Sequence, residues 1–391
     1  MHHVTLDCRK ILTLGRAILL GLAALVALLL SPAIAAQTPP AVDATLAEQL
    51  QGALESSFGA FEVLGCSAAV LLPDGGLWTG TSGISHDSIP VTSDMLFALG
   101  SVTKNYVVPL ILQLVEEGTM SLDDAVSDWL PELSLGSYPS LQQLLNGRSG
   151  LCNVTDRSDL WDAVLADPTR VWTAEDVLAA FPEDPCYLPD ETWHYSNTAY
   201  LVAGWMAERA MGTGMAEAIR SRFLDPLGLG ETVYAVSEPF PDDASVCHGW
   251  FDFDHDGTPD DVTPYRTGIY SVAGASGALF ATASEMAHWV DALLRGDVLS
   301  PASLEAMVTP YSIVPDSGGA DYGFGIYLLG EDAITHSGRT FGYLSLFVHL
   351  RSTGATIVVL INGDDALCLD AVSSALTVAV LRVFTESEAG P

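Results

Sequence analysis

A serine and a lysine stand three residues apart where an apolar helical pattern begins. Ser101 and Lys104 are followed by apolar residues at helical spacing, namely Val107, Leu110, Ile111, Leu114 and Val115. Because positions i and i+3 share one face of a helix, the hydroxyl and the amine can touch. A helix N-terminus also offers unpaired backbone N–H groups, which stabilise an oxyanion. The pair predicts a serine nucleophile with a lysine as its proton acceptor; the alternative is a helix-capping serine beside a solvated lysine.

Lysine is almost absent from this chain, which gives Lys104 added weight. Lysine occurs only at positions 10 and 104, and the remaining basic residues are arginines. Arginine keeps its charge, whereas a buried lysine can lose its proton. To act as a base near neutral pH, Lys104 needs a pKa lowered by roughly 3 units, worth about 4 kcal/mol, which burial can supply.

Two further polar segments could complete such a site. Tyr195 and Asn197 open an apolar run; a phenol can relay a proton, and an amide can orient the lysine. The alternative is a helix start capped by Ser196 or Asn197. His336 and Gly338 end a predicted strand, where a glycine lets a substrate backbone approach closely. Alone, His336 would be read as an ordinary packed or exposed histidine.

A run of alternating aspartates precedes a glycine at position 257. This pattern matches the first half of a calcium-binding loop, but Thr263 stands where the loop's glutamate is expected. The alternative is an acidic surface turn. We expect a structural calcium ion here and no cofactor in catalysis. The expected metal ligands are Asp252, Asp254, Asp256 and Asp260.

The elements that must position these residues indicate an α/β protein. A helix is expected from Asp43 to about Phe58, then a strand over residues 66–72 and a second from Leu77. Helical patterns fill residues 120–245. Later strands are expected at 322–329, 344–350 and 355–362, and a last helix at 370–384. The pattern predicts an antiparallel sheet built from both chain ends and flanked by helices, with an inserted, mainly α subdomain.

The chain begins with a pattern typical of a signal peptide. Basic residues precede an apolar run over residues 17–30, and Ala33-Ile34-Ala35 offers small residues for cleavage. The run is shorter than the roughly 20 residues that a membrane span needs. We expect export to the periplasm or outside the cell, with no stable membrane span after leader removal; the alternative is an uncleaved anchor. The expected divisions are a signal peptide at 1–35, a linker at 36–44 and a domain at 45–385. Within that domain, residues 45–104 and 270–385 form the α/β part and 105–269 the helical insertion.

The net charge limits which binding partners are expected, and the cysteines bear on the compartment. The formal charge of −34 repels nucleic acid and anionic membranes, so no nucleic-acid partner is expected. Five cysteines follow the leader, and an oxidising compartment permits disulfides. Cys152 and Cys186 bracket one loop-rich stretch and are the favoured pair.

Taken in order, the three polar segments resemble the motifs of the serine β-lactamase and penicillin-binding-protein superfamily. The motifs are SxxK, YxN and a [KH]-[ST]-G triad, and the resemblance covers about residues 45–385. It is strongest for the branch that holds class C β-lactamases, DD-carboxypeptidases, D-aminopeptidases and related esterases. It implies a β-lactamase-like fold.

The resemblance also implies a role for each motif residue. Ser101 would be the nucleophile, Lys104 its base and Tyr195 the proton relay, with an oxyanion hole formed by the backbone N–H groups of Ser101 and Arg339. His336 replaces the lysine of the β-lactamases, which counts against efficient β-lactamase activity. The Arg339 side chain either binds a substrate carboxylate or points to solvent. The implied substrate-binding residues are Asn197, His336, Ser337, Gly338 and Arg339.

These expectations predict a D-alanyl-D-alanine carboxypeptidase or a D-amino-acid peptidase or amidase. The alternatives are a carboxylesterase of the same fold, a β-lactamase or a non-catalytic penicillin-recognising protein. The substrate would be a small peptide, a peptidoglycan-like molecule or an ester. Other hydrolase classes lack support, since the chain has no G-x-S-x-G and no H-E-x-x-H.

Overall fold

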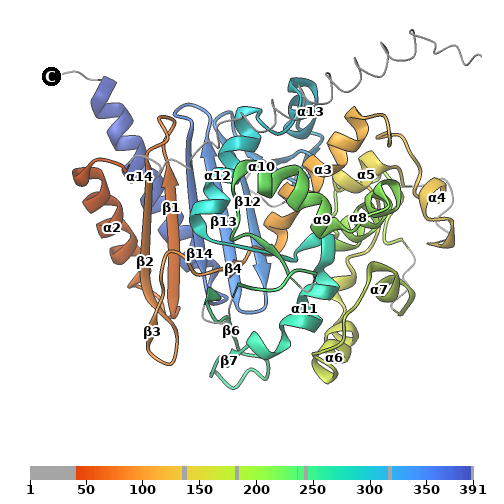
Figure 1. Ribbon diagram of the computed structural model, residues 1–391, viewed down its shortest axis with the longest axis horizontal. Coiled ribbons are helices and arrows are strands. Elements are labelled where there is room, and N and C mark those ends of the chain that lie inside the picture. Colours follow the sequence, from red (N-terminus) through yellow and green to blue (C-terminus); the bar gives the residue numbers. More distant parts are fainter. Residues whose placement is uncertain are drawn as a thin grey trace, which may run out of the picture. The chain divides into compact units, whose positions relative to one another are not determined.

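One antiparallel sheet joins the two ends of the described chain (Figure 1). The computed structural model describes residues 41–133, 139–180, 185–235, 237–241, 245–315 and 319–388. Within them, nine strands follow the order β3-β2-β1-β14-β13-β12-β11-β10-β9. The predicted signal peptide and residues 36–40 of the linker lie outside these ranges.

The central strands are buried on both faces, which explains their continuous apolar sequences. Strand β1 (Gly65–Leu71) pairs with β14 (Ala355–Ile361) from Cys66–Ile361 to Leu71–Thr356. The other strands of this sheet are β2 (Leu77–His86), β3 (Ile89–Pro90), β9 (Ser312–Ile313), β10 (Asp321–Tyr322), β11 (Tyr327–Leu329), β12 (Ala333–Thr340) and β13 (Tyr343–Leu350). Smaller sheets hold β4 (Phe97–Ala98), β5 (Val233–Tyr234) and β8 (Leu279–Ala281), and β6 (Trp250–Phe251) with β7 (Asp260–Asp261).

Two terminal helices cover one face of the sheet (Figure 1). Helix α2 (Ala44–Phe58) is capped by the Asp43 side chain, which accepts from the N–H groups of Thr45 and Leu46. Its residues at four-residue steps are buried, as predicted: Leu46, Leu50, Leu54 and Phe58. They pack with apolar residues of β1, β14 and α14 (Ala366–Glu388).

The opposite face is covered by α12 (Ala283–Arg295) and by a largely helical region (Figure 1). The remaining helices are α3 (Lys104–Glu116), α4 (Val126–Trp129), α5 (Leu141–Leu145), α6 (Ser158–Ala166), α7 (Ala174–Ala180), α8 (Asn197–Met211), α9 (Met215–Ile219), α10 (Asp225–Leu227), α11 (Arg266–Ala273) and α13 (Pro301–Met307). The predicted architecture, a sheet from both chain ends with helices between, is confirmed. The exact division into an α/β part and an insertion stays a prediction.

Two expected elements differ from the structure. The single strand predicted at 322–329 is wrong, because the chain turns at Gly325, whose φ of +65° favours glycine, and forms the antiparallel pair β10–β11. Helix α14 begins four residues before the predicted start at Asp370, since the Asp365 carboxylate accepts from the N–H groups of Leu367 and Cys368.

Helix α14 has the length and the hydropathy of a membrane span over Ala366–Thr385. The core helices of soluble proteins share these properties. Here Val372, Leu376 and Val380 are fully buried in the layer between α14 and the sheet.

Candidate active site

Ser101 lies in a tight 3-10 turn, Gly100–Thr103, that leads directly into α3. Gly100 has a φ of +49°, a conformation that residues with a side chain rarely adopt. A Cβ atom built at Gly100 would also lie 2.9 Å from the Arg339 backbone nitrogen. The missing side chain therefore lets the serine turn rest against strand β12. This contact brings together the two backbone segments expected to form the oxyanion hole.

Lys104 is fully buried, and its amine lies at the centre of a hydrogen-bonded cluster. Its Nζ atom is 3.0 Å from Ser101 Oγ, 2.7 Å from Asn197 Oδ1 and 2.9 Å from the Ser276 carbonyl oxygen. Burial lowers the pKa of Lys104 well below its usual value. A neutral amine has two N–H donors, which Asn197 and Ser276 accept, and one lone pair, which then faces the Ser101 hydroxyl. This geometry suits proton removal from Ser101.

Asn197 is held in place by a loop that sequence reasoning missed. Its Nδ2 donates to Thr155 Oγ1 at 2.8 Å, and its backbone N–H donates to Asn153 Oδ1 at 2.9 Å. Because the amide nitrogen is engaged with Thr155, the amide oxygen turns toward Lys104. The loop stands next to the candidate disulfide cysteine, but no motif marked Asn153 or Thr155. The Ser276 carbonyl had no signal either, since any residue supplies a backbone oxygen.

Tyr195 lies beside both Ser101 and Lys104. Burial, and then the neighbouring Tyr327 phenol, raise the pKa of Tyr195, while a hydrogen bond with the Ser101 hydroxyl opposes the rise. The Lys104 amine is 4.9 Å from the centre of the Tyr195 ring. The phenol therefore stays protonated and can donate to an oxygen or nitrogen near Ser101. Ser196 takes the capping role considered above, because its Oγ accepts from the Ala199 N–H.

His336 is buried and neutral. Burial is the main cause that lowers the pKa of His336 to about 3. Its Nδ1 lies 2.6 Å from the Ser337 carbonyl oxygen, so Nδ1 carries the proton and donates. Within the described residues, Nε2 has no hydrogen-bond partner. Ser337 alternates with His336 along β12 and is exposed. The imidazole thus offers a lone pair rather than a positive charge.

Gly338 and Arg339 both make contacts within the protein, and their predicted substrate-binding roles stay predictions. A Cβ atom at Gly338 would collide with the Leu99 carbonyl oxygen, so the glycine makes room for the segment before Ser101 rather than for a substrate. The Arg339 guanidinium donates to Asp364 Oδ2 at 2.6 Å, and its side chain is 72% exposed. Arg339 is therefore exposed and ion-paired, although it also lines the cavity that contains Ser101.

A cavity of about 420 Å³ opens over Ser101. Its polar wall includes Asn197, Thr155 and Asp156. Three aromatic residues form an apolar wall: Trp161, Phe251 and Phe341. The centre of the Phe341 ring is 4.8 Å from that of Trp161 and 5.0 Å from that of Phe251, both in edge-to-face contacts. The cavity can hold a small substrate with one apolar group next to the nucleophile.

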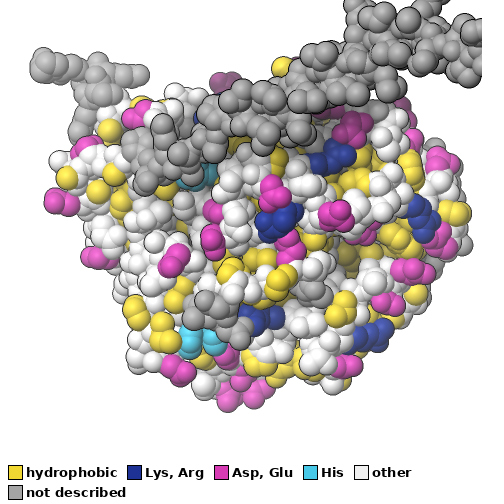
Figure 2. Space-filling view, viewed as in Figure 1, with side chains coloured by type: hydrophobic (Ala, Val, Ile, Leu, Met, Phe, Trp, Pro, Cys, Tyr) yellow, Lys and Arg dark blue, Asp and Glu magenta, His cyan; other side chains and the backbone are white. Residues whose placement is uncertain are grey.

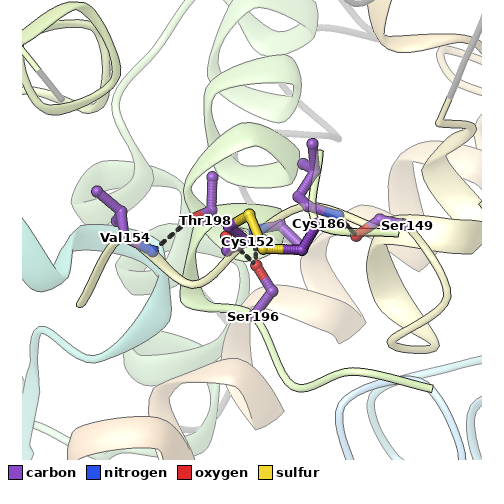
Figure 3. The surroundings of a disulfide bond; sticks show 8 residues. Ser149, Cys152, Val154, Cys186, Ser196 and Thr198 are labelled. Atoms are coloured by element: carbon purple, nitrogen blue, oxygen red, sulfur yellow. Dashed lines mark hydrogen bonds between the residues drawn. A yellow bond between two sulfur atoms is a disulfide. The ribbon is translucent and has the colours of Figure 1, made fainter. Parts of the chain in front are cut away.

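The predicted disulfide between Cys152 and Cys186 is confirmed (Figure 3). It adjoins the loop that holds Asn197 and the start of α8. In Figure 3, Ser196 donates to the Cys152 carbonyl oxygen at 3.0 Å, and the Val154 N–H donates to Thr198 Oγ1 at 2.8 Å. These hydrogen bonds tie the loop 152–155 to the start of α8, and the disulfide ties the same loop to Cys186. The other described cysteines, Cys66, Cys247 and Cys368, are buried and free.

Three of the four predicted calcium ligands lie together. The carboxylates of Asp252, Asp254 and Asp256 place one oxygen each within 4.8 Å of one another. Asp260 does not belong to this group, because it lies in β7, paired with Phe251 of β6. Backbone N–H groups donate into the loop, such as that of Gly257 to Asp252 Oδ2 at 2.9 Å. The calcium site stays a prediction with three side-chain ligands.

Three comparisons show which known proteins this chain is similar to. A family model described as Beta-lactamase matches residues 59–376, a span that includes all three polar segments. Penicillin-binding protein 4* of Bacillus subtilis (strain 168) is 26% identical over 326 residues, which cover 78% of this chain and 71% of that protein. Esterase EstB of Burkholderia gladioli is 30% identical over 213 residues, covering 50% of this chain and 53% of that protein. The solved structure of D-amino acid amidase from Ochrobactrum anthropi SV3, complexed with L-phenylalanine amide, is similar with a TM-score of 0.76 and 27% identity; the match covers 88% of this chain and 100% of that one.

Proposed function

Because the chain belongs to the Beta-lactamase family of serine hydrolases, which also holds penicillin-binding proteins, we propose that it is an exported enzyme that cleaves small amides or peptides of D-amino acids through an acyl-enzyme on Ser101. The observation that carries the proposal is the buried Lys104 amine, 3.0 Å from the Ser101 hydroxyl, with both of its N–H groups accepted elsewhere. A capping serine with a solvated lysine would have neither the burial nor these contacts.

Acylation follows from the geometry of the three central side chains. The neutral Lys104 amine takes the Ser101 proton as Oγ attacks the substrate carbonyl. The backbone N–H groups of Ser101 and Arg339 are proposed to stabilise the resulting oxyanion. The Tyr195 phenol, which burial keeps protonated, donates to the leaving nitrogen and is recharged from the Lys104 ammonium. Water then attacks the acyl-enzyme by the reverse proton path and releases the acid.

The charges at the site favour an amidase or aminopeptidase over a D-alanyl-D-alanine carboxypeptidase. A carboxypeptidase must receive the terminal carboxylate of its substrate, which calls for a cation. Burial lowers the pKa of Lys104, His336 is neutral at pH 7 because its pKa is lowered to about 3, and Arg339 is bound to Asp364. The solved D-amino acid amidase, similar over most of this chain, supports the same choice.

An esterase is the second candidate. Esterase EstB is 30% identical over half of this chain, and the same Ser101–Lys104 pair would cleave an ester. The chemistry differs only in the leaving group, since an alkoxide needs less help from Tyr195 than an amine. A β-lactamase is the third candidate, and His336 in place of lysine weighs against it.

Intact-mass measurements test the nucleophile. After incubation with a fluorophosphonate, we expect one adduct that maps to Ser101 and is absent from Ser101→Ala. The matched control is Ser57→Ala, the same substitution on α2 and outside the cavity lining, and this variant should still form the adduct. An adduct on another serine would refute the assignment. D-phenylalanine amide and nitrophenyl acetate, compared as substrates, then separate the amidase from the esterase.

The location and the N-terminus of the expressed protein test the proposed export. Expression of the full chain in a bacterial host should give an extracytoplasmic protein whose N-terminus lies near residue 36, because residues 33–35 offer the small side chains that leader cleavage needs. An intact N-terminus on a cytoplasmic protein would contradict it.

A further inference from the structure

We propose that Asp156 binds the ammonium group of a substrate whose α-amine is free, beside the carbonyl that Ser101 attacks. The inference rests on the proposed function and narrows its substrate class to amides or peptides with a free N-terminal amine. Asp156 would be a specificity-determining residue, since it contacts the substrate but takes no part in the proton transfers.

Asp156 lines the same cavity as Ser101 and is exposed to solvent there. Its Oδ1 accepts from Asn153 Nδ2 at 2.7 Å, and Asn153 Oδ1 accepts from the Asn197 N–H at 2.9 Å. Asn197 in turn accepts from the Lys104 amine. One chain of hydrogen bonds thus runs from the carboxylate to the nucleophile. In the described part of the chain, no hydrogen bond or ion pair engages the second carboxylate oxygen, Oδ2, which leaves it for a ligand.

The cavity has a negative charge that no described protein group neutralises. The adjacent Arg157 donates two hydrogen bonds to Asp159 instead. The other cation on the cavity wall, Arg339, is paired with Asp364. Within the described lining, Asp156 therefore remains the unpaired charge, and its complement is a cation. The acidic side chains spread over the face seen in Figure 2 and the net charge of −34 also attract cationic molecules at long range.

The apolar wall specifies what the substrate carries besides the amine. One cavity is lined by Trp161 of α6, Phe251 of β6 and Phe341 in the turn after β12. A substrate with its carbonyl at Ser101 and its ammonium at Asp156 has its side chain left for this wall. An aromatic or large aliphatic side chain fits there. N-acylation of the substrate would remove the ammonium and place a carbonyl oxygen near the carboxylate.

The test compares D-phenylalanine p-nitroanilide with its N-acetyl derivative on the full-length enzyme. The wild type should cleave the free amine with a kcat/KM about tenfold higher or more, as expected for a hydrogen bond between charged groups. In Asp156→Asn the ratio between the two substrates should fall about tenfold. The control is Asp162→Asn, which removes the same charge from an exposed position on α6 outside the cavity lining. Its ratio should match the wild type.

Each outcome decides one question. An unchanged ratio in Asp156→Asn, or an equal fall in Asp162→Asn, would overturn the Asp156 assignment, because the preference would then come from elsewhere or from net charge alone. Nitrophenyl acetate, which has no amine, distinguishes a failure of the Asp156 assignment from a failure of the proposed function. If nitrophenyl acetate acylates Ser101 but the two anilides are cleaved with equal kcat/KM, only the inference about Asp156 fails. If no substrate or ester acylates Ser101, the proposed function itself is wrong.

Discussion

Removal of the Cys152–Cys186 disulfide should weaken both the fold and the catalytic step. The two cysteines are separated by 34 residues, and closing a loop of that length constrains the unfolded chain by about 4 kcal/mol. For a domain of this size, that corresponds to a fall in melting temperature of about 5 °C. We expect this loss in Cys152→Ser/Cys186→Ser and in the wild type treated with dithiothreitol.

The effect on activity should exceed the effect on substrate binding. The disulfide adjoins Asn153 and Thr155, which hold the Asn197 amide so that its oxygen faces Lys104. Loosening this loop shifts the lysine ligand, and small displacements of catalytic groups cost about ten- to a hundredfold in rate. We therefore expect kcat toward nitrophenyl acetate to fall while KM changes little.

Melting curves and steady-state kinetics on the same samples provide the check. Dithiothreitol added to the double variant is the control for effects unrelated to this bond, and it should change nothing. Unchanged kcat together with an unchanged melting temperature would refute the role given to the disulfide. A lower melting temperature with normal kcat would restrict the bond to stability.

Further predictions concern the lysine, the histidine and the aspartate loop. Lys104→Arg, which keeps the charge but cannot form a neutral amine, should lower the acylation rate by about two to three orders of magnitude; a near-normal rate in stopped-flow acylation would show that the lysine is a bystander. Because the neutral amine is the active form and burial lowers the Lys104 pKa, kcat/KM should rise with pH through that lowered pKa and then level off, and a fall over the same range would contradict the base role. Between pH 6.5 and about 3, His336 binds fewer protons in the folded state than in the unfolded state. The free energy of unfolding should therefore decrease as pH falls through this window, by as much as about 5 kcal/mol. Acid unfolding of His336→Gln should lack this contribution. Chelation should lower the melting temperature and calcium should restore it, through Asp252, Asp254 and Asp256; identical curves would reduce the loop to an acidic turn.

The features predicted best from the sequence are those that depend on residues close together along the chain. Ser101 and Lys104 meet because three residues separate them at a helix start, so no tertiary information was needed. The same holds for α2, whose cap and buried face follow from Asp43 and the leucines at four-residue steps. The central strands were also predictable, since their continuous apolar runs require burial on both faces.

The residues that sequence reasoning missed depend on tertiary contacts. Asn153 and Thr155 meet Asn197 only because the disulfide loop folds back on α8. The orientation of Arg339 could not be predicted, because its partner Asp364 lies 25 residues away, beyond two further strands. The Ser276 carbonyl leaves no mark on the sequence, since its function requires a backbone position and no particular side chain.

The complete burial of the lysine has a consequence for chemical labelling. The chain contains two lysines, Lys10 and Lys104, and the Lys104 side chain has no exposed surface. An amine-reactive reagent applied to the folded protein should therefore reach Lys104 only when the region around α3 opens. The rate at which Lys104 becomes modified would then measure local opening at this one position of the candidate active site, with no engineered probe. Reagents that couple enzymes to a support through lysine would leave the Lys104 amine untouched for as long as the fold stays closed.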